Sequence, residues 1–160
     1  MIRARREQDL EPLCVILRDL GRPAADMPEA DLRGWLEEHE AEQSWVYDMA
    51  PMGVAPTRNV VGHVEIHRPS PALASAVAAH TGGLADDLLA IGKLVVRRDR
   101  HEHGFARHLL NQSVDWIRRY GRRPVLDLVD NVVTKEFCAR YGFEEAPSDA
   151  PRVRVMIHAE

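Results

Sequence analysis

The amino-acid sequence predicts an α/β fold, an α+β mixed sheet flanked by helices. Strand-like and helix-like patterns interleave along its 160 residues, which is typical of layered α/β domains. Apolar residues make up 45 % of the chain, as in an ordinary globular domain with one core. An apolar run at 94–96 is followed by a helical pattern and a second apolar run, which predicts a β-α-β crossover. We expect residues 1–160 to form a single domain.

The first half of the chain predicts three strands and two helices. Leu13, Ile16, Leu17 and Leu20 recur at helical spacing, and Gln8-Asp9 precede them in the position of a helix cap. Pro and Gly concentrate in one later stretch, which predicts a turn or loop there. The expected elements are strands at 2–5, 44–50 and 60–67, helices at 10–20 and 28–40, and a loop at 51–59.

The second half predicts a long connection, then alternating strands and helices. Residues 68–86 are long for a link between two strands, which indicates a functional loop or a small added helix. The nearly continuous apolar run at 124–129 is typical of a buried central strand. Asn131 and Gly142 stand where a cap and a terminator of the next helix belong. The remaining expected elements are a strand at 87–97, a helix ending at Gly121, a helix at 131–141 and an outer strand at 152–158.

Composition excludes several classes of protein. No apolar run reaches the ~18 residues of a membrane helix, and the N-terminus has no apolar signal region. Cys14 and Cys138 are too few for a disulfide framework, so we expect a cytoplasmic protein with free thiols. The net charge of −4 argues against a nucleic-acid partner, and we expect no membrane partner.

The stretch RRDRHEHGFARHLL, residues 97–110, gathers positive charge where a strand turns into a helix. The first backbone N–H groups of a helix lack partners and bind anions, phosphate in particular. Gly104 lets a bulky ligand approach the backbone, and Ala106 keeps the first turn small. This pattern favours a pyrophosphate site, and the alternative is an ordinary turn with a solvated charged surface.

Two motifs together resemble the GCN5-related N-acetyltransferase (GNAT) family. The strand KLVV runs into His101-Glu102-His103-Gly104-Phe105-Ala106, similar to that family's phosphate-binding loop, although His101 stands where the family prefers Arg or Gln. The later NVVTKEFCARYGF, residues 131–143, has the family's spacing from an Asn to Gly-Phe. The resemblance implies a GNAT-like acyl-CoA N-acyltransferase fold, acetyl-CoA as cosubstrate, a small-molecule or peptide amine as acceptor, and a possible homodimer.

The resemblance also implies the residues that bind the cofactor. One strand should pair with the pantetheine arm, the N–H groups at the helix start should hold the pyrophosphate, Arg107 should reach a phosphate, and Asn131 should hydrogen-bond the arm. The set is Leu94, Val95, Val96, His101, Glu102, His103, Gly104, Phe105, Ala106, Arg107 and Asn131.

The acid that protonates the leaving thiolate is a Tyr in the family, and Cys138 occupies that position here. A thiol, with a pKa of about 8.5 against ~10 for a phenol, is either the acid or a small buried residue without a role. Tyr141, three positions further on, is the second candidate, and water is another.

The general base is also displaced, because Ala90 stands where many members of the family carry Glu. On the preceding strand His63, Glu65 and His67 alternate and therefore share one face. That face is a general base or substrate contact, a metal site, or a solvent-facing surface. We predict a catalytic role for His63 and Glu65, and we expect no metal.

The resemblance therefore implies an acetyl-CoA-dependent N-acetyltransferase, and we expect its acceptor to be a primary amine of a small molecule. The alternative within the same fold is a catalytically weak or inactive CoA-binding module with a regulatory role. A nucleotide-binding α/β protein of another kind is a third interpretation, against which the absence of a Gly-x-Gly-x-x-Gly or Walker loop argues.

Overall fold

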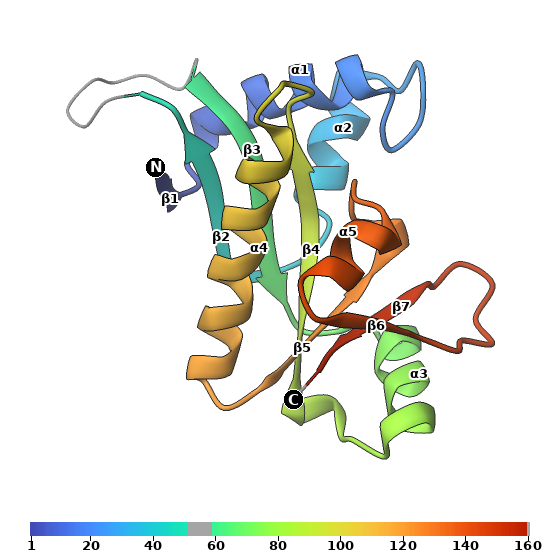
Figure 1. The fold of residues 1–160 in the computed structure, drawn as a ribbon. Coiled ribbons are helices and arrows are strands. Elements are labelled where there is room, and N and C mark those ends of the chain that lie inside the picture. The colour runs from blue at the N-terminus through green and yellow to red at the C-terminus, as the bar shows by residue number, and fades with distance from the viewer. Residues whose placement is uncertain (51–58, 160) are drawn as a thin grey trace.

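A computed structural model describes residues 1–50 and 59–159, so most of the loop predicted at 51–59 lies outside the described residues. One mixed sheet runs through the molecule in the order β1-β2-β3-β4-β5-β7-β6, as Figure 1 shows. The strands are β1 (Ile2–Ala4), β2 (Ala41–Asp48), β3 (Val60–His67), β4 (Leu88–Val96), β5 (Arg123–Asp127), β6 (Phe143–Ala146) and β7 (Val155–His158). The predicted α/β class is therefore confirmed.

Helices cover both faces of the sheet. The helices are α1 (Leu10–Leu20), α2 (Glu29–Leu36), α3 (Pro71–Thr81), α4 (Glu102–Arg119) and α5 (Lys135–Arg140). α4 and α5 share one apolar cluster with Leu89 and Ile91. α1 and α2 form a second cluster and α3 a third, which includes Leu88 and Ala90. Because successive side chains of a strand point to opposite faces, α3 lies on the face of β4 opposite α4.

Several predicted elements differ from the observed ones. The long connection at 68–86 contains α3, whose N-cap is the Ser70 side chain. The C-terminal strand is not an outer strand, because β7 lies between β5 and the unpredicted edge strand β6. The helix predicted at 131–141 begins only at Lys135, where the Thr134 side chain accepts the cap hydrogen bond. The Asp9 side chain makes no cap bond to α1 and instead accepts hydrogen bonds from Arg3 and Arg6.

The two parallel strands at the centre of the sheet separate halfway along β4. β4 pairs with β5 only from Leu88 to Ile91. Further on, β4 contains an extra residue relative to β3, because Glu65 faces Gly92 whereas His63 faces Val95. Lys93 lies in this bulge with φ +52°. A bulge bends its strand and ends regular pairing, so the second half of β4 diverges from β5.

The buried Asn131 side chain spans the gap that this divergence leaves. Its Oδ1 accepts a hydrogen bond from the Leu94 N–H at 2.9 Å, and its Nδ2 donates to Ile91 O at 3.1 Å and Asp127 O at 2.8 Å. The Val132 N–H donates to Leu94 O at 2.8 Å. Four hydrogen bonds from two residues thus replace strand pairing at the fork between β4 and β5.

Replacing Asn131 by Ala should destabilise the protein strongly. The change leaves one N–H and two carbonyl groups without partners at a buried position, and each such group costs about 1–3 kcal/mol. We expect the free energy of unfolding in urea to fall by roughly 2–5 kcal/mol. The matched control is Asn111→Ala on an exposed position of α4, which should change it by about 0.5 kcal/mol or less. Equal effects of the two substitutions would contradict the role given to Asn131.

Candidate active site

The fork between β4 and β5 leaves one edge of β4 open. The Arg97 N–H donates to Val61 O on β3, whereas both backbone groups of Leu94 point to the Asn131 side of the strand. Because backbone groups alternate between the two edges of a strand, those of Val95 face β3 and those of Val96 face the open edge. Of the three residues predicted to pair with a cofactor arm, only Val96 has its backbone groups in position to do so.

The structure therefore corrects the prediction that Asn131 and Leu94 bind the cofactor arm. Their hydrogen-bonding groups engage each other and the neighbouring backbone, so neither side chain nor strand amide is free to bind a cofactor arm. Asn131 instead shapes the fork into which such an arm would fit.

The start of α4 lies at the same end of β4 and presents unpartnered amides. The His101 N–H donates to Asp99 Oδ1 and the Glu102 N–H to Asp99 O. The Phe105 N–H donates to His101 O, and the Ala106 N–H follows it in the helical ladder. The amides of His103 and Gly104 thus remain for an anion.

Two side chains of this turn are buried, so two of the residues predicted to bind the pyrophosphate pack in the core instead. Phe105 and Ala106 pack in the core, and their amides are used by the helix itself. Arg107 lies on the exposed side of the first turns of α4, where a charged side chain is available to a phosphate. Asp99 occupies the helix start, and the hydrogen bond from the His101 N–H and that from Arg97 lower its pKa.

A cavity of about 810 Å³ lies on the α2 side of the fork, bounded by Trp35, Ala90 and Ile91 among others. Acidic and basic side chains both line it. The acidic ones are Glu38, Asp127, Asp130 and Glu136, and the basic ones are Arg22, Lys135, Arg152 and Arg154. A cavity of this volume suits a small organic molecule.

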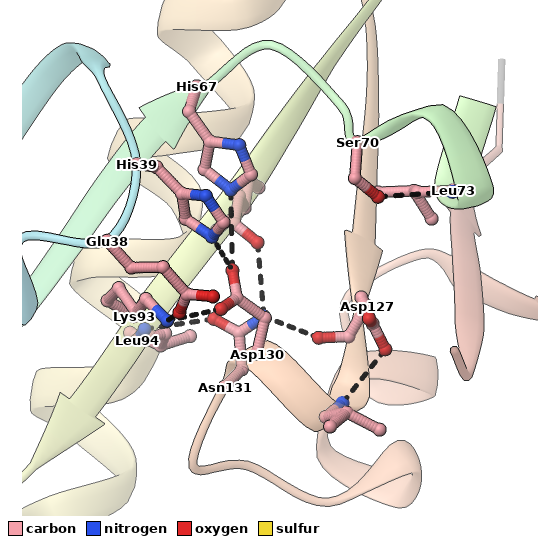
Figure 2. A network of polar contacts seen from close by, with 12 residues as sticks. Glu38, His39, His67, Ser70, Leu73, Lys93, Leu94, Asp127, Asp130 and Asn131 are labelled. Carbon is pink, nitrogen blue, oxygen red and sulfur yellow. Dashed lines mark hydrogen bonds and ion pairs between the residues drawn. The ribbon is translucent and has the colours of Figure 1, made fainter. Parts of the chain in front are cut away.

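A charged network lies at one wall of this cavity, and Figure 2 shows its contacts. Lys93 is fully buried. Its Nζ lies 2.6 Å from Glu38 Oε2 and 2.5 Å from Asp130 Oδ1, and 4.0 Å from the centre of the Trp35 ring. A buried ammonium requires such partners. They also offset the left-handed backbone of Lys93, which costs of the order of 1–3 kcal/mol.

Two histidines complete the network around Asp130. His39 Nε2 lies 3.0 Å from Asp130 Oδ2 and His67 Nε2 lies 3.4 Å from it, and the two rings stack at 3.8 Å. The hydrogen bond to Asp130 raises the pKa of His39 above its usual value. Burial would raise the pKa of Asp130, but its contacts with His39, His67 and Lys93 outweigh burial and hold that pKa well below its usual range.

His63 is not placed to act as a base. It is fully buried; its Nδ1 donates to Lys93 O at 2.8 Å and its Nε2 accepts from Arg5 at 3.1 Å. Burial lowers the pKa of His63 to about 3. The structure therefore contradicts its predicted catalytic role, because both nitrogens are engaged and hold the bulge at Lys93.

Glu65 and His67 lie on the same face as His63, and that face is buried rather than solvent-facing. Burial raises the pKa of Glu65. Glu65 does not line the large cavity, but His39 and His67 do. Its predicted role as a base in contact with substrate is therefore not supported, and its position behind the two imidazoles requires another explanation.

Cys138 also differs from its predicted role as an acid. The thiol is fully buried in the apolar cluster under α4, and burial raises its pKa to about 12. Cys138 does not line the cavity, so the structure supports the packing alternative. Tyr141 packs edge-on against Phe137 at 5.0 Å and does not line the cavity either.

Sequence reasoning missed the network of Glu38, His39, Lys93 and Asp130, of which Glu38, His39 and Asp130 line the cavity. One signal was present, because Lys93 is the only charged residue in the apolar run LLAIGKLVV. A buried lysine requires a carboxylate partner, but the sequence does not show which acid supplies it, since Glu38 and Asp130 are 55 and 37 residues away.

The fork, the helix amides and the adjoining cavity define an α/β protein with a candidate anion site next to a cavity for a small molecule, and comparison with known proteins gives its family. The Acetyltransferase (GNAT) family model matches residues 10–143. The chain belongs to this family of N-acetyltransferases, so the predicted family, fold and enzyme class are confirmed. None of the helices in the described residues has the length and apolarity needed to cross a membrane.

Solved structures with the same fold are distant in sequence. The GNAT family N-acetyltransferase YhbS from Escherichia coli, in complex with CoA, is 16 % identical over 99 % of this chain and 79 % of its own, with a TM-score of 0.63. A GNAT family acetyltransferase from Brucella melitensis, in complex with acetyl-CoA, is 21 % identical over 99 % and 96 %, with a TM-score of 0.57.

An aminoglycoside 6'-acetyltransferase type Ii is 12 % identical over 98 % of this chain and 93 % of its own, with a TM-score of 0.60. A search of curated proteins found no match. At these identities the similar structures establish the fold of the chain alone.

The burial of neutral His63 should make stability depend on pH. The unfolded chain binds a proton at His63 below pH 6.5, but the folded protein binds it only near pH 3. The contribution of His63 to the free energy of unfolding is therefore fully present above pH 6.5 and falls by about 1.4 kcal/mol per pH unit below it.

The measurement is urea unfolding of the wild type and of His63→Gln at pH 7.5 and pH 5. Gln is neutral at both pH values and isolates the histidine from other titrating groups. We expect the wild type to lose about 2 kcal/mol more than the variant. An equal loss would show that His63 is not buried in its neutral form.

Proposed function

We propose that this protein transfers an acetyl group from acetyl-CoA to a primary amine of a small molecule. The observation that carries the proposal is the position of the fork. On one side it is continuous with the open edge at Val96 and the free amides of His103 and Gly104. On the other side it borders the cavity of about 810 Å³ at Ile91. A thioester held along β4 would thus meet an amine in the cavity.

The cofactor half of the proposal rests on complementary chemistry. An extended pantetheine arm offers amide groups that can pair with the backbone of Val96, as a neighbouring strand would. The two helix amides and Arg107 suit a pyrophosphate. YhbS and the Brucella melitensis acetyltransferase, which share the fold, were crystallised with CoA and acetyl-CoA.

The acceptor half rests on the charge and size of the cavity. Glu38, Asp127 and Asp130 line it. Because Glu38 and Asp130 are paired with Lys93, the Asp127 carboxylate is the one that can attract an ammonium group. The volume fits a whole small molecule, and one protein of the same fold is an aminoglycoside 6'-acetyltransferase. These features favour a small amine over the side chain of a large protein.

The reaction is direct aminolysis of the thioester. The ammonium group first gives one proton to water, and its neutral nitrogen then attacks the thioester carbonyl carbon to form a tetrahedral oxyanion. The oxyanion collapses, the C–S bond breaks, and the nitrogen gives up a second proton to become the amide, which balances the proton that the CoA thiolate takes up. Because Cys138 and Tyr141 do not reach the cavity, we propose that water supplies this last proton.

A CoA-binding module with weak or no activity is the second candidate, and the burial of Cys138 favours it. Thiol release from acetyl-CoA in the presence of a panel of small amines separates the two. Turnover with one or more amines supports the enzyme, whereas saturable binding of acetyl-CoA without turnover supports the module.

The cofactor site is tested by calorimetric titration of acetyl-CoA into the wild type, Gly104→Glu and Gly104→Ala. Glu places a negative charge where the pyrophosphate should lie, and each charge-assisted hydrogen bond lost is about 1.5–3 kcal/mol. We expect Gly104→Glu to bind at least roughly 10-fold more weakly.

Gly104→Ala is the matched control for folding and bulk. A Cβ at Gly104 meets no atom within 4 Å, so the Ala variant should fold as well as the wild type. Saturable binding that Gly104→Glu leaves unchanged would place acetyl-CoA elsewhere.

A further inference from the structure

Three buried polar atoms at or just behind the cavity wall have no hydrogen-bond partner among the described residues. They are both carboxylate oxygens of Glu65 and Nε2 of His67. Glu65 is fully buried and His67 is 5 % exposed. A buried polar group without a partner is rare in folded proteins and indicates a missing water or ion.

The tautomer of His67 leaves Nε2 ready to bind a cation. His67 Nδ1 lies 2.7 Å from the backbone oxygen of Arg68. A carbonyl oxygen only accepts, so Nδ1 carries a proton, and Nε2, which lies 3.4 Å from Asp130 Oδ2, is the nitrogen that can bind a cation. A histidine held through one nitrogen by a backbone carbonyl, with the other nitrogen free, is the arrangement found around protein-bound metals.

His39 supplies a third donor to the same place. One ligand atom each of His39, Glu65 and His67 lies within 4.8 Å of the other two. Ligands around tetrahedral Zn²⁺, at about 2.1 Å from the ion, lie roughly 3.4 Å apart. The donors must therefore close by up to about 1.4 Å, which requires the partly exposed ring of His39 to shift from its contact with Asp130.

We propose that His39, Glu65 and His67 bind a divalent first-row transition metal ion, for which Zn²⁺ is the probe. Two imidazoles and one carboxylate are an established donor set for Zn²⁺. The site goes beyond the proposed acetyl transfer, and it departs from our sequence-based expectation of no metal. The ion joins β3 to the segment that follows α2 and so fixes the wall of the acceptor cavity.

Surrounding charge and access both suit a cation. Asp130 Oδ2 lies 3.0 Å and 3.4 Å from the two imidazole Nε2 atoms and adds negative charge next to the site. A second cavity of about 480 Å³ also borders His39 and His67. Its lining includes three acidic residues, Glu38, Glu40 and Glu42, and one arginine, Arg68, so acidic side chains predominate on a metal ion's route from solvent.

The test is isothermal titration of metal-free wild-type protein with Zn²⁺, compared with Glu65→Gln, His67→Gln and the control His80→Gln. His80 lies on the exposed face of α3, outside the cluster. We expect one Zn²⁺ per chain in the wild type and in His80→Gln. The two cluster variants should bind at least about 10-fold more weakly, since even second-sphere changes have effects of that size.

Binding that Glu65→Gln and His67→Gln leave unchanged, or no saturable binding by the wild type, would overturn the site. If the variants do not fold, X-ray absorption at the zinc edge of the zinc-loaded wild type identifies the ligands of the ion directly. Two imidazoles in the zinc coordination sphere support the proposal, and one or none overturns it. Acetyl-CoA binding is measured separately, so failure of the metal site is distinct from failure of the proposed function.

Discussion

The buried side chain of Asn131 is the interaction on which the rest of the site depends. β4 and β5 pair over four residues and then diverge at a bulge, and a sheet that divides in its centre exposes backbone groups that must find partners. The Asn131 amide partners three of them, at Leu94, Ile91 and Asp127. These hydrogen bonds stabilise the separation of β4 from β5 that forms the fork.

The bulge that opens the fork also positions the polar wall of the acceptor cavity. It places Lys93 in a left-handed conformation that directs the ammonium into the α2 side of the sheet, where Glu38 and Asp130 hold it. Gly92 beside it leaves room for the network, because a Cβ there would lie 2.6 Å from Asp130 Oδ2 and 2.7 Å from His67 Nε2. The cofactor edge and the acceptor wall are therefore two consequences of one irregularity in β4.

Local patterns in the sequence predicted the helices and strands, whereas the site depends on contacts between residues far apart in the sequence. The helix at Leu10–Leu20 and the strand at Val60–His67 have the predicted bounds, because their apolar periodicity also determines which face is buried. The Asn131 position was recognised but its partner was not, since hydrogen bonding to Leu94 depends on a bulge that the sequence does not display. The His39–Asp130 contact spans 91 residues and has no local signal at all.

The most direct test of the fork is a crystal structure of the protein with CoA. Asn131 should keep its hydrogen bonds to Leu94 and Ile91, while the pantetheine arm lies between β4 and β5 and pairs with the backbone of Val96. The pyrophosphate should contact the amides of His103 and Gly104. Two results would contradict the structural role given to Asn131. One is a cofactor bound away from the open edge of β4, and the other is an Asn131 side chain that leaves Leu94 to hydrogen-bond the pantetheine arm.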